Sequence, residues 1–139
     1  MLEHRGASAL LTADAFPSVL QRALASLAAS RRQPLPWTLD LIKLSHHGSR
    51  ANTTTRLLET VRAPYTLVST NGAIFGHPDP EGIARVLASG TPGSEVWFNF
   101  RTPRTEVWGG APPQARYSYV ARFPTAAGAT TTVNLSAKA

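Results

Sequence analysis

The sequence predicts an α/β protein with a mostly parallel sheet and covering helices. Between residues 9 and 99, short apolar runs alternate with segments in which apolar residues recur at helical spacing. Such alternation is typical of βα units, in which a helix carries the chain back to begin the next parallel strand. Carboxylate and imidazole side chains follow three of the predicted strands. Together, the two observations predict that these side chains lie at one edge of the sheet.

Length and composition favour a single folded domain. The chain has 139 residues, of which 42% are hydrophobic and 16% charged, as in globular rather than disordered proteins. The absence of cysteine excludes disulfides, thiolate metal ligands and cysteine nucleophiles. No apolar stretch is long enough to span a bilayer, and the first residues lack the pattern of a signal peptide. We therefore expect a cytoplasmic protein with no membrane partner, or a piece of a larger one.

The N-terminal part predicts a hairpin, a strand and a helix. Residues 1–5 have strand character and precede a turn, and residues 9–12 form a short buried strand. Asp14 closes this strand, either as a functional carboxylate or as the cap of the following helix. Apolar residues then recur at helical spacing over residues 19–27, which predicts an amphipathic helix ending near Ser30.

The central strand is the apolar run 39–44, which leads directly into His46 and His47. Its nearly continuous apolar character is typical of a strand buried on both faces. Imidazole is a common metal ligand and titrates near neutral pH, and Gly48 lets the backbone turn sharply. The alternative interpretation is a strand end with two merely exposed histidines.

The remaining elements follow in order. A helix is predicted from about residue 54 to 61, a strand over residues 65–69, a glycine-containing loop with His77, a helix from about 79 to 87, and a strand over residues 95–99. The tail, residues 100–139, predicts antiparallel strands at 105–108, 116–123 and 130–135. Since the carboxyl ends of parallel strands share an edge, Asp14, His46, His47 and His77 are expected to converge.

Three motifs in this order resemble the metallo-β-lactamase fold, most closely the branch found in the DNA-uptake protein ComEC and related soluble hydrolases. They are Leu10-Leu11-Thr12-Ala13-Asp14-Ala15, Asp40-Leu41-Ile42-Lys43-Leu44-Ser45-His46-His47-Gly48-Ser49 and Gly76-His77-Pro78. The resemblance covers about residues 1–99, with Ala13 where the family usually has glycine.

The resemblance implies roles for these residues. Asp14 matches a carboxylate that bridges two metal ions, and one of His46 and His47, of which we favour His47, matches a ligand of the second metal. His46 matches an outer contact to the ligands or the substrate, and His77 a ligand or acid/base group near the substrate. The complete family site would hold two Zn²⁺ ions, which generate hydroxide and clamp a phosphoryl group.

The main metal motif of the family, His-x-His-x-Asp-His or His-x-Asp-x-Asp-His, is absent from this sequence. The histidines are residues 4, 46, 47 and 77, and we expect His4 to be a surface residue of the hairpin. The resemblance therefore predicts that residues 1–139 form one domain, the C-terminal half of an αββα sandwich. Such a half would be a fragment, a truncated protein or one subunit of a split enzyme.

Two functions of different class follow. In the first, the chain is part of a metal-dependent hydrolase of phosphodiesters or related esters, inefficient without its missing half. In the second, it is a non-catalytic remnant or binding module that uses a basic surface or an exposed sheet for a partner. The net charge of +6 permits a nucleic-acid or phosphoester substrate, although the arginines are scattered. We expect an exposed apolar face, covered by the missing half or by self-association.

Overall fold

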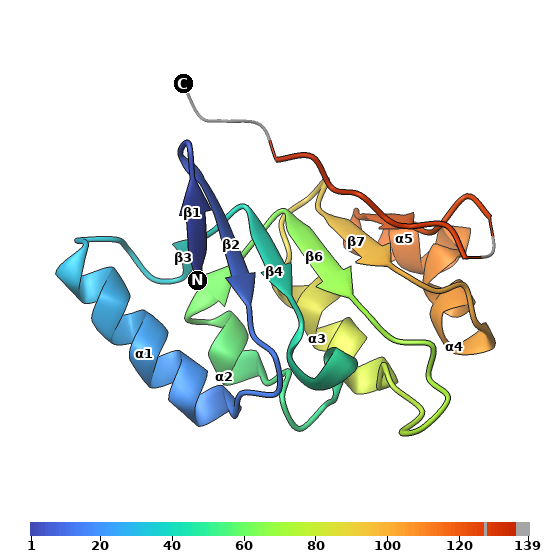
Figure 1. The fold of residues 1–139 in the computed structure, drawn as a ribbon, viewed down its shortest axis with the longest axis horizontal. Coiled ribbons are helices and arrows are strands. Elements are labelled where there is room, and N and C mark those ends of the chain that lie inside the picture. The colour runs from blue at the N-terminus through green and yellow to red at the C-terminus, as the bar shows by residue number, and fades with distance from the viewer. Residues whose placement is uncertain (127, 136–139) are drawn as a thin grey trace.

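The computed structural model describes residues 1–126 and 128–135 and contains a six-stranded mixed sheet (Figure 1). The strand order is β1-β2-β4-β6-β7-β8. Strand β1 pairs antiparallel with β2, and the following pairings across the sheet are parallel. The predicted α/β class with a mixed sheet is therefore confirmed.

The strands of the main sheet are short, and a second pair of parallel strands lies beside them. The main strands are β1 (Leu2–His4), β2 (Ala7–Leu11), β4 (Leu41–Lys43), β6 (Tyr65–Val68), β7 (Glu95–Phe98) and β8 (Val120–Arg122). The small sheet pairs β3 (Trp37–Thr38) with β5 (Val61–Arg62). The helices are α1 (Pro17–Ser30), α2 (Thr55–Leu58), α3 (Pro80–Ser89), α4 (Pro103–Glu106) and α5 (Ala111–Tyr117).

Most elements predicted before residue 100 are present close to their expected bounds. The helix predicted over residues 54–61 is shorter, because α2 ends at Leu58 and the next residues enter strand β5. There Val61 pairs with Trp37 and is almost fully buried. A tertiary pairing therefore overrides the local helical pattern.

Helices α1, α2 and α3 cover one face of the sheet (Figure 1). Alternate strand residues point toward these helices, as the twofold period of a strand requires. The resulting core includes Leu10, Ile42, Val68, Val96 and Phe98 from the strands, together with Leu24, Ala28, Leu57, Leu58, Ile83, Val86 and Leu87 from the helices. This one-sided core fixes the carboxyl edge of the sheet, where the candidate site lies.

The opposite face of the sheet carries a row of side chains in register. The row crosses five strands and consists of Leu11, Lys43, Leu67, Trp97 and Arg122. Leu11 is 61% exposed. The segment 132–135 runs over part of this face, where its residues line cavities with the sheet. The face thus carries apolar residues that the described helices leave uncovered.

The strand predicted at residues 105–108 is wrong, and of the strand predicted at 116–123 only residues 120–122 form one, β8. Residues 103–106 and 111–117 form the helices α4 and α5, and β8 pairs parallel with β7. Thr102 and Thr105 form a reciprocal capping box, and prolines occupy the first turns of both helices. Proline is well suited to a first helical turn, so these signals favoured helices over strands.

The last predicted strand, over residues 130–135, has no regular secondary structure. Residues 127 and 136–139, which also belonged to the predicted β-rich tail of residues 100–139, lie outside the described residues. Within the described part of the chain, no helix combines the length and apolar character needed to cross a membrane.

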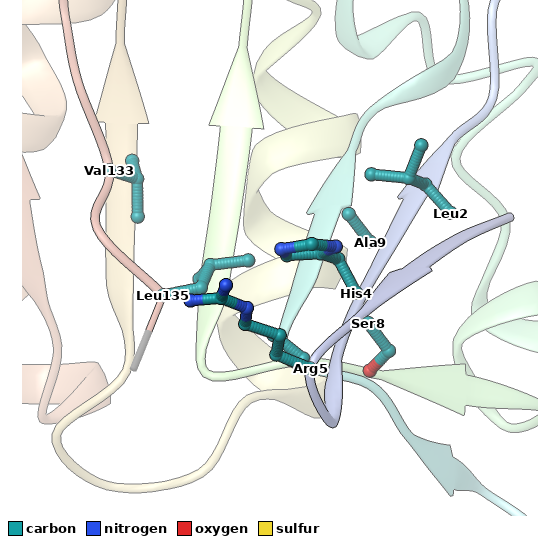
Figure 2. Close-up of a pocket in the computed structure, with 8 residues that line it drawn as sticks. Leu2, His4, Arg5, Ser8, Ala9, Val133 and Leu135 are labelled. Carbon is teal, nitrogen blue, oxygen red and sulfur yellow. The ribbon is translucent and has the colours of Figure 1, made fainter. Parts of the chain in front are cut away.

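A cavity of about 490 Å³ lies between the β1–β2 hairpin and the C-terminal segment (Figure 2). His4 and Arg5 of the hairpin line it together with Val133 and Leu135. His4 is exposed, which confirms its prediction as a surface residue. His4 is the last residue of β1 and lies next to the turn that leads into β2. This turn is at the opposite end of β2 from the loop that carries Asp14.

Candidate functional site

The backbone turns through left-handed conformations where the chain leaves β4. His46, His47 and Gly48 have φ values of 43°, 59° and 84°. Glycine adopts this region readily, but each non-glycine residue there costs about 1 to 2 kcal/mol. Two successive strained histidines persist only if their surroundings hold them, and such strain is found preferentially at functional sites.

Hydrogen bonds to carbonyl groups of the loop after β2 hold this turn in place. The backbone N–H of His46 donates to the Ala13 carbonyl at 2.9 Å. The Ser45 hydroxyl and the Asn52 amide both donate to the Ala15 carbonyl, at 2.9 and 3.1 Å. The loop that carries Asp14 is thereby fastened to the turn that carries the histidines.

Asp14 itself is exposed and close enough to Lys43 to affect its titration. Partial burial lowers the pKa of Lys43, and the Asp14 carboxylate opposes that shift. The interpretation of Asp14 as a helix cap is wrong, because Phe16 occupies the cap position of α1. Asp14 therefore lies at the carboxyl edge of β2 and β4, as predicted, without a capping role.

One ring nitrogen of His47 is already occupied. Its Nδ1 makes a short hydrogen bond with the carbonyl oxygen of Ser69. Since a carbonyl oxygen can only accept, Nδ1 carries a hydrogen, and in the neutral ring the lone pair is then on Nε2. A histidine held in this way presents Nε2 as a ligand or a base.

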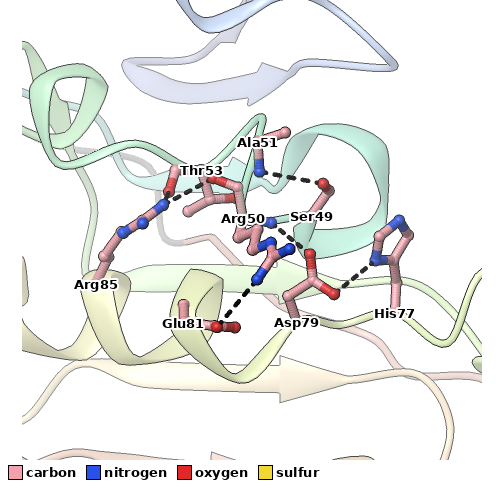
Figure 3. A network of polar contacts seen from close by, with 8 residues as sticks. All are labelled: Ser49, Arg50, Ala51, Thr53, His77, Asp79, Glu81 and Arg85. Carbon is pink, nitrogen blue, oxygen red and sulfur yellow. Dashed lines mark hydrogen bonds and ion pairs between the residues drawn. The ribbon is translucent and has the colours of Figure 1, made fainter.

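His77 is arranged similarly by Asp79 (Figure 3). Its Nδ1 lies 3.3 Å from Asp79 Oδ1, and the other carboxylate oxygen accepts from the Arg50 backbone N–H at 2.8 Å. Burial alone would raise the pKa of Asp79, but the Arg50 amide and then His77 outweigh burial and lower it. Asp79 is therefore a carboxylate that orients the His77 ring.

The surrounding network fixes the loop after the histidines to helix α3 (Figure 3). Arg85 donates to the carbonyl oxygens of Arg50 and Thr53 at 2.7 and 3.0 Å. Gly82 of α3 comes so close to the turn that a Cβ there would lie 2.5 Å from the Gly48 carbonyl oxygen. The absence of a side chain at residue 82 thus permits the close approach of α3 to the turn.

The three histidine rings form one cluster with Phe75. The ring centroid of His46 lies 5.0 Å from that of His77 and 6.1 Å from that of His47. Phe75 lies 5.9 Å from His46 and 6.2 Å from His77. The structure therefore brings together residues that are about thirty positions apart in the sequence, at the edge where they were expected.

A cavity of about 310 Å³ opens beside this cluster. It is lined by His47, Ser69, Thr70, Asn71, Ile74, Phe75, His77, Asn99 and Phe100. Sequence reasoning missed the residues other than the histidines. Ser69 and Asn99 directly follow β6 and β7, so the same strand-end argument would have found them. Asn99 links the ends of β7 and β6, because its side chain accepts from the Thr70 N–H at 2.8 Å and donates to the Ser69 hydroxyl at 3.1 Å.

The site does not by itself hold a complete set of metal ligands. Across residues 1–126 and 128–135, no three or more His, Cys, Asp or Glu side chains are grouped so that they could hold a metal ion. A zinc site requires three or four protein ligands. Asp14, His46, His47 and His77 fit zinc by type, but they do not complete a site in this chain.

No protein-family model matches the chain, and neither a curated protein nor a solved structure matches it at a significant level. The interpretation of the site therefore depends on its own geometry and on the three sequence motifs. The assignment of Asp14 and His47 as ligands, and of His46 and His77 as substrate contacts, stays a prediction.

Proposed function

We propose that this chain supplies part of the active site of a metal-dependent hydrolase of the metallo-β-lactamase fold, which acts on phosphodiesters or related esters. The main support is that His47 and His77 line one cavity, each with Nδ1 engaged and Nε2 available. Imidazoles oriented in this way suit metal binding and proton transfer at Nε2.

Each residue has a role in this proposal. Asp14 and His47 are metal ligands, and the remaining ligands come from another segment or another chain. Bound zinc would supply a hydroxide nucleophile and neutralise the charge on a phosphoryl group. His77, held by the Asp79 carboxylate, contacts the substrate and exchanges a proton at Nε2, while His46 lies next to it and contacts the same substrate. A cytoplasmic location belongs to the same proposal.

Zinc binding by the isolated chain tests the ligand role of His47. We expect at most one weakly held ion, with a change in the side-chain nitrogen resonances of His47 measured by NMR. His47→Ala should abolish zinc binding, measured by calorimetric titration. The control is His4→Ala, at the opposite end of β2, which should leave it unchanged. Unchanged zinc binding in His47→Ala would refute the assignment of His47 as a ligand. Two tightly held zinc ions per monomer would refute the prediction that the metal site of this chain is incomplete.

Reconstitution tests the catalytic role. The isolated chain should not hydrolyse bis(p-nitrophenyl) phosphate efficiently. Addition of a segment with the His-x-His-x-Asp-His motif should restore hydrolysis, and His77→Gln should then reduce kcat by at least about 100-fold, the usual contribution of a general acid or base. Full activity of the reconstituted His77→Gln variant would exclude this role.

A binding module without catalysis is the second candidate, and the open sheet face favours it. The row from Leu11 to Arg122 combines apolar side chains with two cations on a face that no described helix covers. In this function a second copy of the chain covers the face. In that case Leu11→Lys should weaken self-association in sedimentation experiments, whereas a stable monomer of the unaltered chain at high concentration would count against this function.

A further inference from the structure

Three exposed apolar side chains line the cavity beside the histidines. Ile74 and Phe75 are 84% and 69% exposed, and Phe100 is 43% exposed. These side chains come from two segments, the β6–α3 loop and the residues after β7, yet they line the same cavity as His47 and His77. Large exposed apolar side chains that gather beside oriented polar groups are typical of ligand-binding sites.

The loop that exposes Ile74 and Phe75 is held by its own hydrogen bonds. The Thr70 hydroxyl accepts from the Gly72 N–H and the Asn71 side chain from the Ala73 N–H, both at 3.0 Å. The Gly76 N–H donates to the Gly72 carbonyl at 3.1 Å, which closes the loop. The exposure of the two side chains therefore follows from a defined loop conformation.

Phe75 is anchored to the histidines and is still accessible to a ligand. Its ring contacts the rings of His46 and His77, but more than half of its surface faces solvent. The Arg104 guanidinium lies against the same loop, where a Cβ on Gly76 would be 3.1 Å from its Nη2. An exposed aromatic surface beside a cation matches a planar ring attached to an anionic group.

We propose that Phe75, Ile74 and Phe100 bind a planar aromatic ring of the substrate and thereby select phosphoesters that carry such a ring. The phosphoryl part of this inference rests on the proposed function, whereas the binding of the ring rests on the cavity alone. The ring stacks on Phe75 and lies in the cavity of about 310 Å³. The phosphoryl group then faces His47 and His77.

Binding to the metal-free chain tests this inference by NMR titration. The probes are phenyl phosphate, thymidine 5′-phosphate and, without a ring, ethyl phosphate. Both ring-bearing probes should bind about tenfold more tightly than ethyl phosphate, the difference typical of a single stacking contact. Tighter binding of thymidine 5′-phosphate than of phenyl phosphate would identify a nucleobase as the natural ring. Equal or tighter binding of phenyl phosphate would identify a simple aryl group. Both results support the inference.

Substitution of Phe75 provides the decisive comparison. Phe75→Ala should weaken the ring-bearing probes about tenfold and leave ethyl phosphate unchanged. Phe16→Ala is a matched control, because Phe16 is 72% exposed and does not line the cavity. Ile74→Ala should have the same selectivity with a smaller effect. Since these side chains are exposed, the variants should fold normally, which circular dichroism would verify.

Two results would overturn the inference: equal affinity for phenyl and ethyl phosphate, or unchanged affinity for phenyl phosphate in Phe75→Ala. The proposed function is tested by a separate experiment, the measurement of zinc binding in His47→Ala. Selective ring binding without a zinc response would refute the metal site and retain the ring site. A zinc response without selective ring binding would have the opposite meaning.

Discussion

The helix-covered face of the sheet and its carboxyl edge are built in contrasting ways. On the covered face, Phe98 and Ile83 are fully buried among apolar neighbours. At the carboxyl edge, His46 and His47 have strained left-handed backbones and Phe75 is exposed. Burial of apolar side chains in the first region stabilises the fold. Backbone strain and apolar exposure in the second region destabilise it, but they hold side chains where a ligand can reach them.

The largest effect is expected from a cavity in the covered face. Phe98→Ala should lower the free energy of unfolding by about 3 to 5 kcal/mol, because Phe98 is fully buried and stacks on Phe123 at 5.1 Å. Leu67→Ala, the matched control on the open face of β6, should cost less because Leu67 is only partly buried. Urea denaturation measures both, and equal losses would remove the contrast between the two faces.

Burial of a tyrosine gives this packed region a defined response to alkaline pH. The Tyr119 hydroxyl donates to the Trp108 carbonyl, and burial raises the pKa of Tyr119 to about 12. The unfolded chain ionises near the ordinary value of 10.0, so the folded state binds the proton more tightly. Stability from this group should be complete below pH 10 and decline as the pH rises toward 12, by about 1.4 kcal/mol per pH unit.

Tyr119→Phe is the matched variant for this titration. It should cost about 1 kcal/mol at neutral pH through the lost hydrogen bond and flatten the alkaline decline. Denaturant unfolding at several pH values between 8 and 12, the range set by ordinary and shifted tyrosine ionisation, measures both effects. An alkaline decline of the same steepness in Tyr119→Phe would assign it to another group.

The junction between the two regions is sensitive to a single methyl group. An Ala in place of Gly within a helix usually stabilises it by about 0.5 to 1 kcal/mol. At Gly82 the added Cβ would lie 2.5 Å from the Gly48 carbonyl oxygen, so Gly82→Ala should instead destabilise the protein, by about 1 to 3 kcal/mol. It should also shift the ring resonances of His46 and His47 in NMR spectra.

Ala88→Gly provides the control for Gly82→Ala. Ala88 is exposed near the C-terminal end of the same helix, so this change should show at most the ordinary propensity cost of about 1 kcal/mol, without a response of the histidines. A stabilising effect of Gly82→Ala would mean that α3 is farther from the turn than described.

The same contrast explains what could be predicted from the sequence. The covered face was predictable because apolar period and strand length report burial directly, as for the strands that contain Ile42 and Val96. The convergence of the histidines followed from the rule that parallel strands end at a common edge. Neither argument depends on the exact backbone conformation of a loop.

What could not be predicted depends on contacts between distant segments. The left-handed conformations of His46 and His47 are held by the Asp14 loop and by helix α3, and no local pattern encodes them. The helices α4 and α5 are an exception, because Thr102 and the prolines at the helix starts are local signals for them that the strands predicted at residues 105–108 and 116–123 disregard. The exposed apolar side chains beside the histidines were missed because single exposed residues carry no signal until the fold gathers them.

The smallest predicted effect concerns strain next to Asp14. Ala13 has a φ of 47°, a conformation that glycine adopts without the cost that alanine incurs. Ala13→Gly should therefore stabilise the protein, by about 0.5 to 1 kcal/mol after the larger entropy of the unfolded glycine chain is subtracted. Ala23→Gly, at an exposed position within α1, should destabilise by about 1 kcal/mol. Opposite signs in urea denaturation would place strain at the carboxyl edge specifically. Destabilisation by both variants would mean that the loop holding the histidine turn is relaxed, and the contrast between the two regions would then rest on His46 and His47 alone.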